Sequence, residues 1–171
     1  MVKTELCTFC VKSGILCSRC EERVKKGQIT KLDLDTIKLL LELEKRFPDL
    51  ENVRFHKSSE IGELLAIQLD QADVEKITGG EAPILRTISE RLGKKILVVG
   101  YGGDDRRFLE GLLAPLSILT INTIWLPDAS TETKVILQGR LPRHMPVDLE
   151  NSKRIANELR GMTLRIEFER Q

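Results

Sequence analysis

The chain contains one pattern twice: a helix that ends at a glycine and is followed at once by a strand. Within residues 83–99, apolar residues recur three and four positions apart up to Gly93, and a run of Ile, Leu and Val follows. This spacing predicts one face of a helix, a glycine in a left-handed end position and then a buried strand. Residues 152–168 repeat the pattern around Gly161. Aligning the two glycines also superposes an earlier predicted helix of each copy, so the sequence indicates two copies of one unit.

The order predicted for each copy is helix, two strands, short helix, helix and strand. For the first copy we expect helix 35–47, strands 53–57 and 64–69 joined by a polar turn at 58–62, helices 72–77 and 83–92, and strand 96–99. For the second we expect helix 104–114, strands 117–126 and 131–138, about one helical turn within 140–146, helix 152–160 and strand 162–168. Phe55 and Trp125 fall within strands and are predicted to be core residues. Each copy should be a three-stranded sheet with helices on one face, an α+β unit.

All four cysteines lie in the first twenty residues, as Cys7-x2-Cys10-x6-Cys17-x2-Cys20. Two CxxC pairs with a short spacer can bring four thiolates to one tetrahedral ion, and Zn²⁺ is the default ion for such a site. Four protein ligands leave no open position for water, which makes the predicted zinc structural. The alternatives are two disulfides or a redox-active CxxC pair. Because the cysteines are confined to this segment, we expect the rest of the fold not to depend on the metal.

Length and composition indicate small globular domains whose opposite charges nearly cancel over the chain, so that any strong charge is confined to local patches. Hydrophobic residues make up 41% of the 171 residues, enough for packed cores, and the formal net charge is only +1, so a polyanion must be met by local patches. No apolar run is long enough to span a bilayer, and the N-terminus lacks the apolar segment of a secretory signal. We therefore predict a soluble, cytoplasmic protein with a zinc-binding module (1–30), a first domain (31–101) and a second domain (102–171).

The helix–glycine–strand signature of residues 84–99 resembles type II KH domains. The segment 104–119, with Phe-Leu-x-x-x-Leu-Ala-Pro before a strand, is similar to the bridge between the paired KH domains of NusA-like transcription factors. The resemblance covers residues 33–170 and implies two tandem type II KH domains (α-β-β-α-α-β) after a small zinc-binding module. It further implies an archaeal RNA-binding protein of transcription or translation. The implied partners are RNA, including rRNA, and RNA polymerase or the small ribosomal subunit, with no membrane and no small-molecule substrate.

The loops that would hold RNA depart from this family's pattern. A KH domain binds four nucleotides with a GxxG loop, where bare backbone approaches phosphate. In the first copy the loop is Gly79-Gly80-Glu81-Ala82, which keeps two glycines but adds a carboxylate. In the second copy the loop 147–150 has no glycine and carries two carboxylates. We expect the second groove not to bind a strand in the usual way, and Asp148 to be a helix N-cap.

Lysines and arginines around these loops, on the bridging helix and in the cysteine module are candidate phosphate contacts. With Gly79 and Gly80, the predicted RNA-binding residues are Arg86, Arg91, Lys94, Lys95, Arg106, Arg107, Arg140, Arg143, Lys153, Arg154, Lys12, Arg19, Arg23, Lys25 and Lys26. The alternative for each of them is an ordinary solvated side chain in a surface salt bridge.

The sequence contains no pattern that points to catalysis. Residues 98–104 lie between a strand and a helix but fail the GxGxxG spacing of a dinucleotide loop. We therefore expect a protein that is not an enzyme. The function that follows from the resemblance is that of a NusA-like elongation or termination factor. The alternatives are a component or companion of the small ribosomal subunit that binds rRNA, and a protein-interaction adaptor that uses KH folds as a scaffold.

Overall fold

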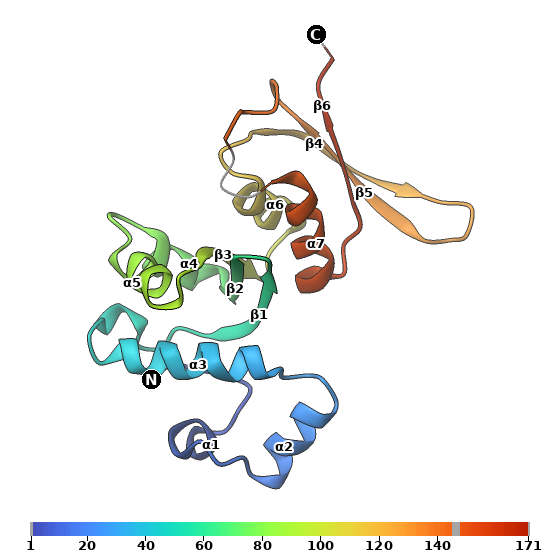
Figure 1. Cartoon of the computed structure of the whole chain (residues 1–171). Helices are drawn as coiled ribbons and strands as arrows, with labels where there is room; N and C mark the ends of the chain where they lie inside the picture. The colour runs from blue at the N-terminus through green and yellow to red at the C-terminus, as the bar shows by residue number, and fades with distance from the viewer. Residues whose placement is uncertain (1, 145–147, 171) are drawn as a thin grey trace. The chain divides into compact units, whose positions relative to one another are not determined.

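The computed structural model describes residues 2–144 and 148–170. The chain divides into two compact units, Met1–Gly102 (unit 1) and Gly103–Gln171 (unit 2). Each unit combines a three-stranded sheet with helices, so the predicted α+β class is confirmed (Figure 1). Within the described residues, no helix has the length and apolar character needed to cross a membrane.

Unit 1 begins with two short helices and continues into a sheet flanked by longer ones. Its elements are α1 (Thr8–Ser13), α2 (Ser18–Lys25), α3 (Lys31–Glu44), the 3-10 turn η1 (Pro48–Leu50), β1 (Phe55–Ile61), β2 (Leu64–Asp70), α4 (Gln71–Thr78), α5 (Pro83–Leu92) and β3 (Lys95–Tyr101). The central strand β2 pairs antiparallel with β1 and parallel with β3. Helix α3 contacts β1, and α4 and α5 contact β3. Gly93 ends α5 in the predicted left-handed conformation (φ 63°).

The predicted turn at 58–62 is wrong, because β1 runs on to Ile61 and only Gly62 and Glu63 separate it from β2. The polar residue Ser58 is buried in the strand, where its N–H and Oγ donate to Asp33 Oδ1 at 2.7 and 2.6 Å. A carboxylate supplied from α3 thus satisfies a serine that would otherwise favour a turn. Asp33 also completes a capping box with Thr30, so α3 begins at Lys31, four residues earlier than predicted.

The cysteine module packs against the rest of unit 1. Cys10 and Cys20, each 2% exposed, belong to the same buried cluster as Ile37 and Leu40 of α3. The segment 1–30 is therefore part of the compact unit that extends to Gly102 and is not a compact unit of its own. The independence of the rest of the fold from the metal stays a prediction, and the packing of two cysteines in the core of unit 1 argues against it.

Unit 2 repeats the strand order of unit 1, with fewer helices among its described residues. Its elements are α6 (Asp105–Leu113), β4 (Ile118–Trp125), β5 (Thr131–Leu137), α7 (Leu149–Arg160) and β6 (Leu164–Phe168). The central strand β5 pairs antiparallel with β4 and parallel with β6, and α7 contacts both α6 and β6. About one helical turn was predicted within 140–146, and no helix forms in the described part of that segment, 140–144. Residues 145 and 146, and residue 147 at the start of the predicted loop 147–150, lie outside the described residues. Pro142 disfavours a helix there.

The β4–β5 hairpin extends beyond the helices of unit 2 (Figure 1). Its end carries Trp125, which is 74% exposed, so the prediction that this residue belongs to a core is wrong. Phe55, the other aromatic residue predicted to be buried, is 2% exposed, and that prediction is confirmed. A strand residue is buried only where a second layer covers it, and the strand pattern alone does not say how far the helices reach.

Candidate functional site

The four cysteines occupy equivalent positions at the starts of two helices. Cys7 precedes the first residue of α1 and Cys10 lies in its first turn; Cys17 and Cys20 hold the same places on α2. A helix N-terminus presents unpaired backbone N–H groups and the positive end of the helix dipole, which favours thiolate. The backbone N–H of Cys17 also donates to Cys10 Sγ at 3.1 Å. The local fold thus aims four sulfur atoms at one point, at helix ends whose backbone N–H groups can stabilise a thiolate.

The sulfur geometry fits a single metal ion. All four Sγ atoms lie within 4.8 Å of one another, with 3.0 Å between Cys7 and Cys10 and 3.8 Å between Cys7 and Cys20. A tetrahedral site with Zn–S bonds of about 2.3 Å has S···S separations of about 3.8 Å. A disulfide needs about 2.05 Å, and all four cysteines are free thiols. The prediction that these cysteines converge on one possible metal site is confirmed.

The thiols of the cluster differ in acidity because they lie so close together. The backbone N–H of Cys20 lowers the pKa of the Cys17 thiol to about 6. The side-chain hydrogen bond between Cys7 and Cys10, whose sulfur atoms lie 3.0 Å apart, lowers the pKa of Cys7 and raises the pKa of Cys10 to about 12. The two thiols share one proton, and losing it would leave two thiolates in repulsion. A divalent cation removes this repulsion and displaces the remaining protons.

The second candidate feature is the turn that joins α4 to α5. Gly79 and Gly80 form it, and a Cβ atom at Gly79 would lie 2.6 Å from the carbonyl oxygen of Glu75. Gly80 has φ +62°, a conformation that favours glycine. Arg86 lies beside this turn, with Nη2 donating to the carbonyl oxygen of Glu81 at 3.0 Å. The turn therefore presents backbone without side chains, next to one guanidinium.

The corresponding position of unit 2 has a different chemistry. Asp148 is the N-cap of α7: its Oδ1 accepts from the Asn151 N–H at 2.7 Å and its Oδ2 from the Asn151 side chain at 3.1 Å. The predicted cap is confirmed. A carboxylate committed to a helix start gives phosphate nothing to bind.

Seven of the predicted RNA-binding cations are engaged in ion pairs. The pairs are Arg23–Glu5, Lys25–Glu21, Lys26–Glu22, Arg91–Glu42, Lys94–Glu60, Arg106–Glu110 and Lys153–Glu150. Exposed pairs of this kind contribute about 0–1 kcal/mol each, so phosphate could displace a carboxylate, but each contact would first have to break a pair.

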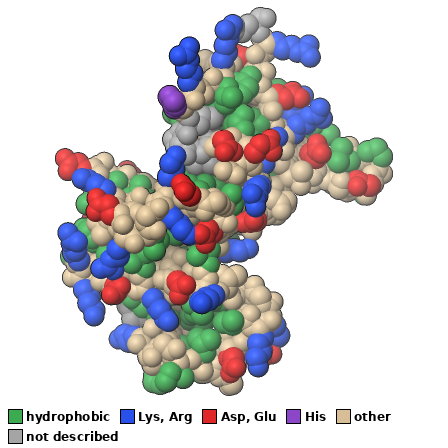
Figure 2. Space-filling view, viewed as in Figure 1, with side chains coloured by type: hydrophobic (Ala, Val, Ile, Leu, Met, Phe, Trp, Pro, Cys, Tyr) green, Lys and Arg blue, Asp and Glu red, His purple; other side chains and the backbone are tan. Residues whose placement is uncertain are grey.

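The other predicted cations lie on the surface at separate places. They are Lys12 on α1, Arg19 on α2, Arg86 on α5, Lys95 at the start of β3, Arg107 on α6, Arg140 and Arg143 after β5, and Arg154 on α7, all exposed. On the face of each unit shown in Figure 2, Lys and Arg side chains alternate with Asp and Glu. That face carries no broad basic patch, and binding of a polyanion there would depend on individual residues.

Sequence reasoning missed two groupings of charged and aromatic side chains. In unit 1, His56 Nε2 lies 2.5 Å from Asp70 Oδ1, and the imidazole stacks on Tyr101 with ring centroids 3.9 Å apart. In unit 2, the Arg160 guanidinium lies 5.0 Å from the ring centroid of Phe108. These contacts join residues 14 to 52 positions apart along the chain, so no local spacing could have revealed them.

Comparison with known proteins assigns no family. No protein-family model matches the chain, and no curated protein matches it either. A solved structure, the crystal structure of the archaeal protein APE1850, is similar at 18% identity and a TM-score of 0.49. The match covers 75% of this chain and 96% of that chain. A likeness at this level supports no conclusion about function.

Proposed function

We propose that the protein is a NusA-like factor that binds RNA through two tandem type II KH domains and is stabilised by one structural zinc ion. Support comes from the shared plan of the two units: a helix, an antiparallel hairpin, then one or two helices and a third strand parallel to the second. In unit 1 the order is α-β-β-α-α-β, which the resemblance implied for a type II KH domain.

The observation that carries the proposal is the turn between α4 and α5. It combines the bare backbone of Gly79 and Gly80 with the Arg86 guanidinium. In a KH domain the loop between these two helices holds the nucleotides, so this turn would hold them if unit 1 is a KH domain. Phosphate can approach the backbone there, since no Cβ atom stands in its way. Glu81 opposes this approach, so we expect weak affinity for a short strand and broader contacts with a folded RNA.

The zinc ion has a structural role in this proposal. Four cysteines would fill its coordination sphere and leave no place for a water molecule or substrate. The ion would hold α1 and α2 together at their N-terminal ends and keep Cys10 and Cys20 in the core against α3.

The resemblance favours a role with RNA polymerase in elongation or termination. A place on the small ribosomal subunit is the second candidate, because the glycine-free start of α7 and the scattered cations suit contact with a large folded RNA. Crosslinking followed by sequencing separates these roles: reads spread over nascent transcripts support the first, and reads at fixed rRNA positions support the second.

Two arginines of α5 provide the test of RNA binding. Arg86 lies beside the glycine turn, whereas Arg91 Nη1 pairs with Glu42 Oε2 at 3.0 Å. Arg86→Ala should weaken binding of a short single-stranded RNA about fivefold and reduce the slope of log affinity against log salt by about one. Arg91→Ala, a matched change on the same helix, should alter both quantities less. Fluorescence anisotropy at several salt concentrations measures both.

Equal effects of the two variants would remove the glycine turn from the interface. A native protein that binds neither the short strand nor a large folded RNA would overturn the proposed function, and the adaptor role would take its place.

A further inference from the structure

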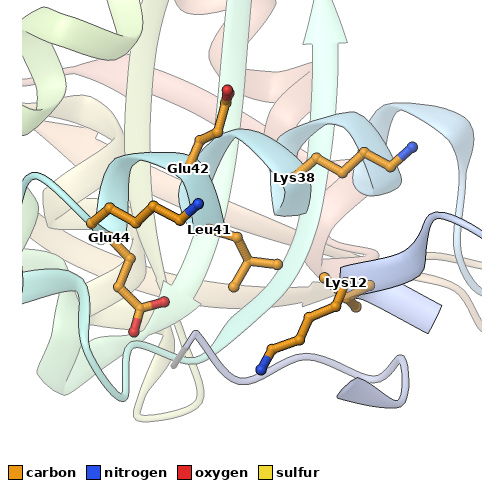
Figure 3. Close-up of a pocket in the computed structure, with 7 residues that line it drawn as sticks. Lys12, Lys38, Leu41, Glu42 and Glu44 are labelled. Carbon is orange, nitrogen blue, oxygen red and sulfur yellow. The ribbon is translucent and has the colours of Figure 1, made fainter. Parts of the chain in front are cut away.

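A groove of 590 Å³ lies between α1 and α3 of unit 1 (Figure 3). It lies on the seam where the cysteine module packs on α3, and it is separate from the glycine turn. Its lining residues are Val11, Lys12, Lys38, Leu41, Glu42, Glu44 and Lys45. Of these residues, only Lys12 was predicted from the sequence to contact a ligand.

The groups available to a ligand in this groove are cationic. Lys12, Lys38 and Lys45 are exposed, and none of them has an ion-pair partner in the part of the chain that the structure describes. The two carboxylates are already engaged: Glu42 pairs with an arginine of α5, and Glu44 Oε2 accepts from a backbone N–H at 3.2 Å. Figure 3 shows Glu42 pointing away from the side on which Lys12 lies. The groove therefore favours an anionic occupant.

The floor of the groove is apolar. Leu41 projects from α3 toward the side of Lys12 (Figure 3), and Val11 lines the groove from α1. A second cavity of 90 Å³ shares Val11 and Lys38 with the groove, and most of its other walls are aliphatic: Leu6, Leu16, Leu34 and Ile37. Its size suits a single aliphatic side chain, since an apolar cavity of about 150 Å³ accommodates benzene.

Together these features distinguish a protein segment from a nucleic acid. RNA phosphates would satisfy the lysines, but RNA has no aliphatic group for the cavity. Lys38 and Lys45 lie seven residues apart on one face of α3, about 10 Å along the helix. Alternate residues of an extended peptide point to the same face, and four residues span about 13 Å. Carboxylates four positions apart, with an aliphatic residue midway between them over Leu41, could therefore meet both lysines, whose flexible side chains cover the remaining distance of about 3 Å.

We propose that the α1–α3 groove is a docking site for an acidic segment of a partner protein. One aliphatic side chain of that segment enters the cavity beside Val11, and its carboxylates pair with Lys12, Lys38 and Lys45. This site is separate from the glycine turn, because none of the three lysines lies there; only Lys12 is also a predicted RNA contact.

Selection from a phage library of random dodecapeptides on the full, metal-loaded chain tests the proposal. Enriched peptides should carry Asp or Glu on both sides of an aliphatic residue. Lys38→Glu/Lys45→Glu should weaken a selected peptide about tenfold or more, because two attractive contacts become repulsive. The charge-matched control Lys3→Glu/Lys31→Glu, which changes two exposed lysines outside the groove, should leave the affinity within about twofold. Replacing the aliphatic residue of the peptide by alanine should weaken binding about fivefold.

Failure to enrich acidic and aliphatic peptides would overturn the proposal, as would selected peptides that bind the Lys38→Glu/Lys45→Glu variant as tightly as the native chain. A third outcome, in which that variant loses affinity for a folded RNA such as tRNA and no peptide is enriched, would overturn it in favour of an RNA contact.

Discussion

Units 1 and 2 share a strand order but differ in how their central strands are covered. Nearly every residue of β2 in unit 1 is buried, whereas β5 in unit 2 is buried only at Val135 and Leu137. Unit 1 has two helices between its hairpin and last strand and the cysteine module on α3; the described part of unit 2 has only α7 between its hairpin and last strand. The comparison teaches that one topology can support a closed core and an open hairpin, depending on what packs around it.

Metal removal should separate the two units most strongly. Replacing Cys7 and Cys20 by serine should abolish binding of one equivalent of zinc and destabilise unit 1 by several kcal/mol, since metal binding contributes about 10–16 kcal/mol in small zinc domains. Hydrogen exchange followed by mass spectrometry should show lost protection in α3 and unchanged protection in α7. Equal protection of α3 in both proteins, or purified native protein without zinc, would contradict this account.

Truncating one isoleucine in each central strand sharpens the comparison of the cores. Ile67→Ala in β2 removes a side chain that is 1% exposed and should cost about 2–5 kcal/mol. Ile136→Ala in β5 removes a partly exposed side chain and should cost about 1 kcal/mol. Urea unfolding of each variant measures the difference. A larger loss of stability from Ile136→Ala than from Ile67→Ala would contradict the conclusion that the β4–β5 sheet is less covered than the sheet of unit 1.

The smallest expected effects concern the two helix starts. Asp148→Lys should lower stability by about 1 kcal/mol through loss of the α7 cap and leave affinity for a short RNA unchanged. Glu81 caps no helix. Glu81→Lys removes a negative charge from the glycine turn and should raise the affinity for a short RNA about fivefold. Anisotropy titrations and melting temperatures of both variants test the pair. A gain in affinity from Asp148→Lys alone would place the RNA groove in unit 2.

Local patterns predicted much of the fold and the metal cluster. Helix ends at Gly93 and Gly161 and the convergence of the cysteines follow from residue type and spacing over a few positions. The burial of Ser58 in a strand could not be predicted, because its partner Asp33 lies 25 residues away. The pairing of Lys94 with Glu60 was hidden for the same reason, so sequence overestimated the number of cations available to RNA.

The same limit applies to the cysteine module. Its spacing predicted a cluster of thiols but gave no sign that Cys10 and Cys20 would pack with Ile37 and Leu40. Which face of a short helix packs on its neighbour depends on the tertiary fold. The spacing of the four cysteines constrains only the coordination of the ion.

The exposed hairpin end has a consequence for spectroscopy. Trp125 is the single tryptophan of the chain, and its indole is largely in contact with water in the folded protein. Tryptophan emission should therefore have a wavelength close to that of free indole in water and change little when the chain unfolds. Unfolding of unit 1 would not be detected by tryptophan emission. A molecule that covers the end of the β4–β5 hairpin would shift the emission to shorter wavelength.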